Sequence, residues 1–271
     1  MALLFDPNHL ILDERQSEKL FNGLLIASQV LGALSILLVA VWMGGIEDGF
    51  AWSSEPEREF HYHPTFMVMG MVFLFGESLL VYRVFRHERK KFSKLLHLIL
   101  HTLVLCLALT ALKAVFDNHN LHTKKLDDGT VVDDPLPNMM SLHSWIGMAT
   151  VIIFATQYAG GFITFFFPGL SMPTRAMFLP FHQVAGLGIF MLVSISVALG
   201  ISERAAWKHS CWTKDHVWCA QHTVSNLTGV AIFLYSACIV VLVANPRWKR
   251  VPLPEEQQLQ QLNTYTHSSI E

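Results

Sequence analysis

The stretch KLLHLILHTLVLCLALTALKAVF, residues 94–116, decides how this sequence is interpreted. It is long enough to cross the hydrocarbon core of a bilayer, which takes about 20 mostly apolar residues. His97 and His101 enter this apolar run four residues apart, and a helix places them on the same face. Because polar side chains are costly inside a membrane, both imidazoles are candidates for a functional role.

The composition of the whole chain is typical of an integral membrane protein. Of its 271 residues 52% are hydrophobic and 15% are charged, whereas soluble domains carry about 25% charged residues. The net charge of −2 gives no indication of a nucleic-acid partner. Four cysteines are too few for a disulfide scaffold. Acidic residues precede the first apolar run, so we expect that run to be a retained span and not a cleaved signal peptide.

Apolar windows of sufficient length predict an all-α membrane protein with six transmembrane helices. The expected spans are 20–43, 62–84, 95–116, 140–166, 178–201 and 222–244. The chain is thereby divided into an N-terminal segment, a six-helix domain and a polar tail that we expect to be disordered. Their bounds are 1–19, 20–244 and 245–271.

The distribution of basic residues between the loops predicts the orientation of the chain. Lys and Arg gather between spans two and three, before span five and after span six, and these loops share one face. We therefore expect both termini in the cytoplasm. On the opposite, oxidising side, one loop contains Cys211 and Cys219, which we expect to form a disulfide.

The histidines of the spans sort into two pairs by depth. Spans two and four start at the outer face and carry His63 and His143 in their first turns. Spans three and five start at the inner face, and carry His97 or His101 and His182 near their starts. Two imidazoles that face each other across a four-helix core are typical of the axial ligation of a haem.

Two other interpretations of these histidines are less favoured by the pattern. Structural zinc takes four clustered His, Cys or acidic ligands, and no Cys or acidic residue of the membrane interior lies beside these positions. A hydrogen bond to a neighbouring helix explains a single intramembrane histidine well, but it does not explain four that pair by depth on alternate helices. Two haems, one near each face, would conduct electrons across the membrane.

Several short motifs follow one another along spans two to five, over roughly 55–200. They are FHYHP (60–64), SLLVYRVFR (78–86), SKLLH (93–97), AVFDNHN (114–120), SLHSW (141–145) and PFH (180–182). Together they resemble the cytochrome b561 family of transmembrane ascorbate-dependent oxidoreductases, and its vesicular and ferric-reductase members most closely. The resemblance implies that helices two to five form a four-helix core around two b-type haems.

The resemblance also implies which histidines are the axial ligands of the haem irons. His63 and His143 form the outer pair, and His97 and His182 form the inner pair. His101 then lies one turn deeper on the helix of His97, with a role either beside the inner haem or in packing.

Ascorbate is an anion at neutral pH, so its binding site should present cations beside the inner haem. Arg83, Lys94 and Arg175 lie at that end of the predicted helices. The resemblance implies that these three residues bind ascorbate on the cytoplasmic side.

The resemblance places the electron acceptor, monodehydroascorbate or Fe³⁺, at the outer ends of spans three and four. The residues implied there are Asn118, His119, Ser141 and Trp145. His119 would supply an imidazole to iron or help to move a proton, and is the catalytic candidate.

The resulting hypothesis is electron transfer from cytoplasmic ascorbate to an acceptor outside the cell or in a vesicle lumen. The protein would be a multi-pass protein of a secretory or endolysosomal vesicle or of the plasma membrane, and the resemblance allows a homodimer. One alternative is a haem subunit fed by a partner protein, which would show haem but little reduction by ascorbate. Another is a transporter with proton-relay histidines, which would show no visible absorbance.

Overall fold

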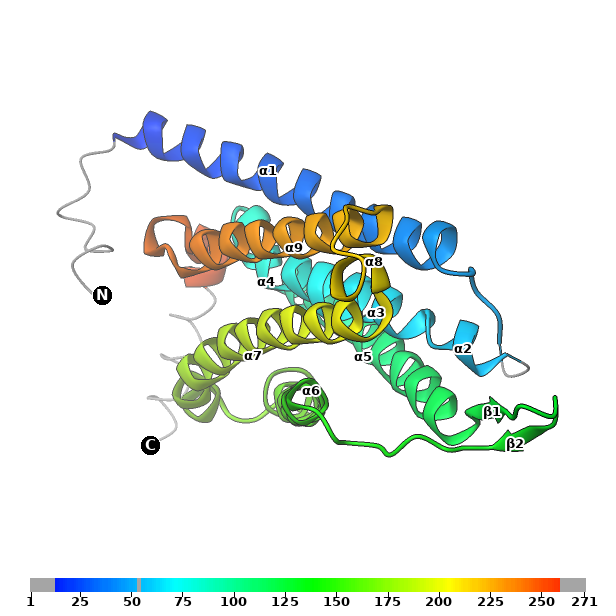
Figure 1. The fold of residues 1–271 in the computed structure, drawn as a ribbon. Helices are drawn as coiled ribbons and strands as arrows, with labels where there is room; N and C mark the ends of the chain where they lie inside the picture. The colour runs from blue at the N-terminus through cyan, green and yellow to red at the C-terminus, as the bar shows by residue number, and fades with distance from the viewer. Residues whose placement is uncertain (1–12, 53–54, 259–271) are drawn as a thin grey trace.

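The computed structural model describes residues 13–52 and 55–258, which form a bundle of long helices (Figure 1). Within these residues, six helices are long and apolar enough to cross a membrane, as the sequence predicts. They run over Glu14–Ile46, Pro56–Val84, Lys90–Asn120, Leu142–Phe166, Met172–Lys208 and Ala220–Ala244. Most extend a few residues beyond the predicted spans, because polar turns continue a helix past the apolar layer. Parts of the predicted N-terminal segment and tail lie outside the described residues.

The second span is assembled from several shorter pieces, whereas the others are dominated by one long helix each. In chain order the elements are α1 (Glu14–Val41), α2 (Pro56–Glu59), α3 (Tyr62–Met67), α4 (Phe75–Val84), α5 (Lys90–Asn120), β1 (Thr123–Lys125), β2 (Val131–Asp133), α6 (Leu142–Gly161), α7 (Met172–Lys208), α8 (Ser210–Thr213) and α9 (Ala220–Ala244). A π-helical segment, Val68–Leu74, joins α3 to α4. Such segments often occur at functional sites.

Helix α1 lies on the outside of the bundle, alongside α9 (Figure 1). Helix α9 also contacts α4 and α7, α5 packs against α3 and α4, and α6 packs against α7. Ser28, Gly32 and Ser35 are buried on α1, and small residues of this kind let helices approach closely in lipid. A Cβ atom on Gly32 would lie 2.6 Å from the ring of Phe73, so a larger side chain would push α1 away.

A polar cluster ties α1 and α9 to the second span. The amide Nε2 of Gln29 donates to Oε1 of Glu77 at 2.9 Å. The hydroxyl of Tyr235 donates to the carbonyl of Phe73 at 2.9 Å and lies 3.2 Å from the same Glu77 oxygen. The two outer helices are therefore attached to the core by hydrogen bonds as well as by apolar contacts.

The loop that follows α5 contains a hairpin that the sequence pattern does not predict. Strands β1 and β2 are antiparallel, with Thr123 opposite Asp133, and their side chains are exposed. The turn is fixed by Asp128, which accepts hydrogen bonds from the hydroxyl and the backbone N–H of Thr130 at 2.6 and 2.9 Å. These bonds lower the pKa of Asp128. Strands of three residues are too short to leave a clear alternation in the sequence.

Residues 245–258 of the predicted tail contact the end of the bundle where α4 ends and α5 begins. The indole of Trp248 is buried and donates to Oγ of Ser17 at 3.1 Å. Glu256 accepts a hydrogen bond from the backbone N–H of Lys90, the first residue of α5, at 2.9 Å, and pairs with Arg250 at 2.8 Å. Burial alone would raise the pKa of Glu256, but these hydrogen bonds outweigh it and lower the pKa.

Candidate functional site

The outer pair of predicted ligands comes together across the bundle. His63 lies on α3 and His143 lies on α6, and the centroids of their rings are 6.1 Å apart with an angle of 84° between the ring planes. Nδ1 of His63 is 3.2 Å from the carbonyl oxygen of Ala111, and Nδ1 of His143 is 2.8 Å from that of Ser196. Each ring is thus attached to a helix other than its own.

The inner pair has a closely similar arrangement. His97 on α5 and His182 on α7 have ring centroids 6.3 Å apart and an angle of 68° between their planes. Nδ1 of His97 is 2.9 Å from the carbonyl oxygen of Ser78, while the carbonyl of His182 accepts a hydrogen bond from Gln157 at 2.7 Å. The depth argument from the sequence predicts which helices pair, and the resemblance implies His97, and not His101, as the member from α5.

The hydrogen bonds define the tautomer of His63, His97 and His143. A carbonyl oxygen can only accept, so Nδ1 of each of these rings carries the proton and Nε2 keeps its lone pair. Histidines that bind a metal through one nitrogen usually donate the other N–H to such an acceptor, which fixes the orientation of the ring. These three rings are therefore in the form that a metal requires.

Two glycines make room for the rings. A Cβ atom on Gly200 would lie 2.7 Å from Cε1 of His143, and one on Gly161 would lie 2.9 Å from Cε1 of His182. Both distances are shorter than real Cβ contacts, so any larger residue would displace the ring. Sequence reasoning missed both glycines because nothing along the chain connects them with a histidine.

The two pairs lie at different depths along the same helix, α5. His97 belongs to the inner pair, and Ala111, which accepts from His63, marks the depth of the outer pair. These positions are 14 residues apart (111 − 97), about 21 Å at 1.5 Å per residue. The sites are therefore separated by most of the thickness of a bilayer core, which is about 30 Å.

The number and type of side chains in each histidine pair indicate which metal or metal cofactor can bind there. Among residues 13–52 and 55–258, no group of three or more His, Cys, Asp or Glu side chains could hold a metal ion. Each pair offers two imidazole nitrogens, too few for a structural zinc site. The residues fit an iron that brings its other ligands with it in a planar ring, as in haem.

His101 is not a member of either pair. Its ring lies 4.4 Å from the ring of His97, and its Nε2 is 2.8 Å from the hydroxyl oxygen of Ser78. The same serine carries the carbonyl that accepts from His97. His97 and His101 are thus connected through one residue of α4, Ser78.

The three predicted cations of the inner end do not all gather in one place. Nζ of Lys94 donates to the carbonyl of Phe165 at 2.9 Å, and Arg175 is close enough to Lys94 to repel its charge. Nε of Arg175 is buried and has no hydrogen-bond partner among the described residues. Arg83 instead donates to the carbonyl of Val243, which ties α4 to the end of α9.

Sequence reasoning also missed a fourth cation near the inner pair. The charge of Arg250 acts on Tyr82, and the ring of Tyr82 lies 5.6 Å from that of His97. Arg250 belongs to the segment that follows α9, far from the inner pair along the chain. Its basic neighbours are visible in the sequence, but the position of Arg250 depends on how the tail folds back.

At the outer end, His119 is the predicted residue that faces a neighbouring loop. Its Nδ1 is 2.9 Å from Oδ1 of Asn138, and it is close enough to His63 to interact electrostatically. Asn118 is buried and donates to the carbonyl of Pro56 at 3.0 Å, so its amide holds α5 to α2.

The two predicted residues beside His143 are occupied in local structure. Ser141 caps the N-terminus of α6 through reciprocal hydrogen bonds with Ser144, both 3.1 Å long. The indole of Trp145 is 67% exposed and donates to the carbonyl of Met139 at 2.8 Å. The contacts of both residues are those of a helix start.

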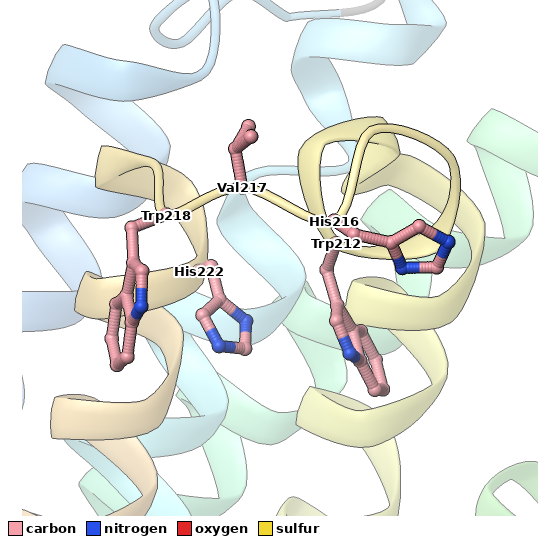
Figure 2. A pocket seen from close by; sticks show the side chains of 5 residues that line it. All are labelled: Trp212, His216, Val217, Trp218 and His222. Carbon is pink, nitrogen blue, oxygen red and sulfur yellow. The ribbon is translucent and has the colours of Figure 1, made fainter.

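The third outer loop contains the predicted disulfide and a cavity of its own. The structure joins Cys211 to Cys219. The cavity has a volume of about 250 Å³, and Figure 2 shows His222 between the indoles of Trp212 and Trp218. None of the predicted ligands or substrate residues lines it.

These features define a multi-pass membrane protein with two cross-helix histidine pairs at different depths of one bundle. The profile of eukaryotic cytochrome b561 matches residues 62–208, which include all four histidines of the pairs. The chain belongs to the cytochrome b561 family, as its motifs predict. Membership of this family implies binding of b-type haem.

Relatives of the chain are named as ascorbate-dependent reductases. It is 60% identical over 268 residues to a Caenorhabditis elegans protein named as a homolog of transmembrane ascorbate-dependent reductase CYB561, with 99% of both chains covered. It is 35% identical to transmembrane ascorbate-dependent reductase CYB561 of Sus scrofa, with 86% of each chain covered. It is 32% identical to plasma membrane ascorbate-dependent reductase CYBRD1 of Mus musculus, with 89% of this chain and 79% of that protein covered.

Proposed function

We propose that this protein transfers electrons from cytoplasmic ascorbate across a membrane to monodehydroascorbate or Fe³⁺ on the other side. The observation that carries the proposal is the pair of histidine sites, with ring centroids 6.1 and 6.3 Å apart, at two depths of one bundle. The names of the relatives support ascorbate as the electron donor.

Each histidine pair would hold one b-type haem, which supplies a reversible one-electron couple when bound. His97 and His182 would hold the inner haem through its iron, and His63 and His143 would hold the outer haem. The carbonyl acceptors at Nδ1 orient the rings and raise the basicity of Nε2. Because the carbonyl acceptors belong to helices other than those of the rings, the packing of the bundle orients the rings for binding.

On the cytoplasmic side, Lys94 and Arg175 would bind the ascorbate anion. Their mutual repulsion is relieved by a bound negative charge, and the unpartnered Nε of Arg175 has a hydrogen bond to offer. Arg83 would contribute positive charge from the edge of this site, since its guanidinium is held by α9. The excess of Lys and Arg in these loops supports a cytoplasmic location for this end and for both termini.

On the outer side, the acceptor would approach the end of α5. Nδ1 of His119 contacts Asn138, so its other ring nitrogen, Nε2, would bind Fe³⁺ or take part in proton transfer. Asn118, Ser141 and Trp145 would shape this end of the site, because their own hydrogen bonds are made within the protein.

The test is reconstitution of the purified full chain into liposomes that contain ascorbate, with monodehydroascorbate or ferric citrate added outside. We expect two b-type components in the visible spectrum and reduction of at least one acceptor. Lys94→Ala combined with Arg175→Ala should raise the ascorbate concentration for half-maximal rate about tenfold or more. Lys91→Ala, which removes an exposed charge from the same end of α5, is the matched control.

Protein without haem would contradict the proposal. Protein with haem that ascorbate does not reduce, or a double variant with an unchanged ascorbate dependence, would favour a haem subunit fed by a partner protein. The comparison of the two acceptors decides between a monodehydroascorbate reductase and a ferric reductase.

A further inference from the structure

His101 has an unusual environment for a histidine inside a membrane helix. It lies one turn after His97 on α5, and the rings of Phe75 and Phe154 flank it at centroid distances of 5.0 and 5.5 Å. Phe190 extends this cluster through its contact with Phe75 at 5.6 Å. The cluster takes one ring from each of α4, α5, α6 and α7, and leaves the imidazole little freedom to rotate.

The hydroxyl of Ser78 determines which nitrogen of His101 carries the proton. This hydroxyl donates its one proton to the carbonyl of Phe75 at 2.8 Å. Its oxygen must therefore accept at the second contact, from Nε2–H of His101 at 2.8 Å. The neutral ring then carries its lone pair on Nδ1.

This Nδ1 atom is buried and has no hydrogen-bond partner within the part of the chain that the structure describes. A buried acceptor without a partner is destabilising, and such groups are few in folded proteins. A leucine or phenylalanine would fill the same space among aromatic rings without that cost. The bond from Nε2 to Ser78 is therefore the polar contact that this imidazole makes.

Ser78 connects His101 to a predicted haem ligand. Its carbonyl oxygen accepts the Nδ1 proton of His97 at 2.9 Å, and its hydroxyl oxygen accepts the Nε2 proton of His101. The two rings also make an edge-to-face contact at 4.4 Å, with 83° between their planes. His101 thus holds His97 in two ways, through a shared serine and through direct ring contact.

We propose that His101 is a positioning residue for the inner haem site, which fixes the orientation and basicity of His97 through Ser78. The inference rests on the proposed function, because it assumes that His97 is a haem ligand. A ligand whose Nδ1–H bond is well aligned is a stronger donor to the iron and shifts its reduction potential. His101 therefore sets the potential of the inner site and leaves that of the outer site unchanged.

The experiment is a potentiometric titration of both haems in the purified holoprotein, with His101→Leu, Ser78→Ala and the double variant. We expect each single variant to change the redox equilibrium of the inner haem about tenfold, a shift of about 59 mV for one electron. The double variant should shift no further than the larger single effect, because the two residues act through one hydrogen bond.

Two further variants separate hydrogen bonding from packing. His101→Gln places an amide N–H near the position of Nε2 and should keep the potential close to that of the unaltered protein. Phe154→Leu removes a ring that packs against His101 but keeps the hydrogen bond between His101 and Ser78, and should leave both potentials in place. Ser78→Ala keeps the core filled, so it provides the measurement if His101→Leu does not fold.

The inference is overturned if Ser78→Ala and His101→Leu leave the inner potential unchanged, or if His101→Gln shifts it as much as His101→Leu does. It is also overturned if the outer potential moves by the same amount as the inner one. Failure of the proposed function would look different, because the unaltered protein would then show no pair of haem potentials at all.

Discussion

A Cβ atom on Gly161 would lie 2.9 Å from Cε1 of His182, whereas one on the preceding Gly160 would meet nothing within 4 Å. Two adjacent glycines of α6 therefore differ in whether they face a predicted haem ligand. A Cβ atom on a third glycine, Gly200 of α7, would likewise lie 2.7 Å from Cε1 of His143, a member of the outer pair.

Gly161→Ala should displace His182 and weaken binding of the inner haem about tenfold or more, while the outer haem stays bound. Gly160→Ala is the matched control, and should leave haem content unchanged because its methyl group enters open space. Haem content and the two redox components of the purified variants give the measurement. Equal loss of haem in both variants would contradict the assigned contact.

Gly200→Ala should produce the opposite pattern, with loss of the outer haem and retention of the inner one. Gly188, also on α7, has nothing within 4 Å of an added Cβ and provides the control. An inner-site defect in Gly200→Ala would show that the pairing of depths is wrong. Haem content and the two redox components of the purified variants are measured as for Gly161→Ala.

Replacing one ligand of each pair should remove one haem at a time. His143→Leu should reduce haem content by about half and spare the inner component, and His182→Leu should do the reverse. His87→Gln, which changes an exposed histidine of the loop between α4 and α5, should keep both haems. The ratio of haem to protein, measured by the pyridine haemochrome method, decides the outcome. A stable His182→Leu protein that keeps both haems and the full rate of electron transfer would contradict the proposed function.

Acidity should loosen the outer end of the bundle through His209. This ring is fully buried, and its centroid lies 5.6 Å from that of Trp42. Neither of its nitrogens has a hydrogen-bond partner among residues 13–52 and 55–258. Burial lowers the pKa of His209, and the positive charge of Arg204 lowers it further, although Glu47 acts in the opposite direction.

Since the folded state holds this histidine neutral, its contribution to stability is present above the unfolded pKa of about 6.5 and is lost as the pH falls below it. The melting temperature in detergent should therefore decrease between pH 7 and pH 5, and His209→Phe should reduce that decrease by several degrees. His87→Gln should leave the pH dependence in place. An identical pH profile in His209→Phe would assign the effect to other groups.

Loss of the carboxylate of Glu256 should destabilise the end of the bundle at which α5 begins. Glu256→Gln weakens the bonds to Arg250 and to the first backbone N–H of α5, and we expect a loss of about 1 kcal/mol because the pair is partly screened by solvent. The pKa of Glu256 is lowered, so this stabilisation is present above the unfolded pKa of about 4.3 and disappears as the pH falls through the folded value. Glu255→Gln, at a 4.0 Å ion pair between exposed side chains, is the control. Thermal unfolding at pH 7 and pH 4 should show a difference between the two variants that narrows at the lower pH.

The partners of the charged residues could be predicted less well than the positions of the histidines. The start of α5 follows from a long apolar run with His97 in its first turns, and the pairing with His182 follows from the alternating direction of the spans. The carbonyl that accepts from Arg83 belongs to Val243, 160 residues away, and no local pattern encodes that distance. The role of Ser141 as a helix cap can be predicted from the local sequence, because Ser144 follows three residues later and completes the capping box.

The sequence alone determines that this chain forms six membrane-spanning helices and that its intramembrane histidines fall at two depths, because hydrophobic length and helical period are local properties of a chain. The tertiary structure decides which backbone carbonyl orients each imidazole, which glycine yields space to it, and how His101 connects to His97. Those relationships depend on the rotation and approach of neighbouring helices, which are set by packing between segments far apart in the chain.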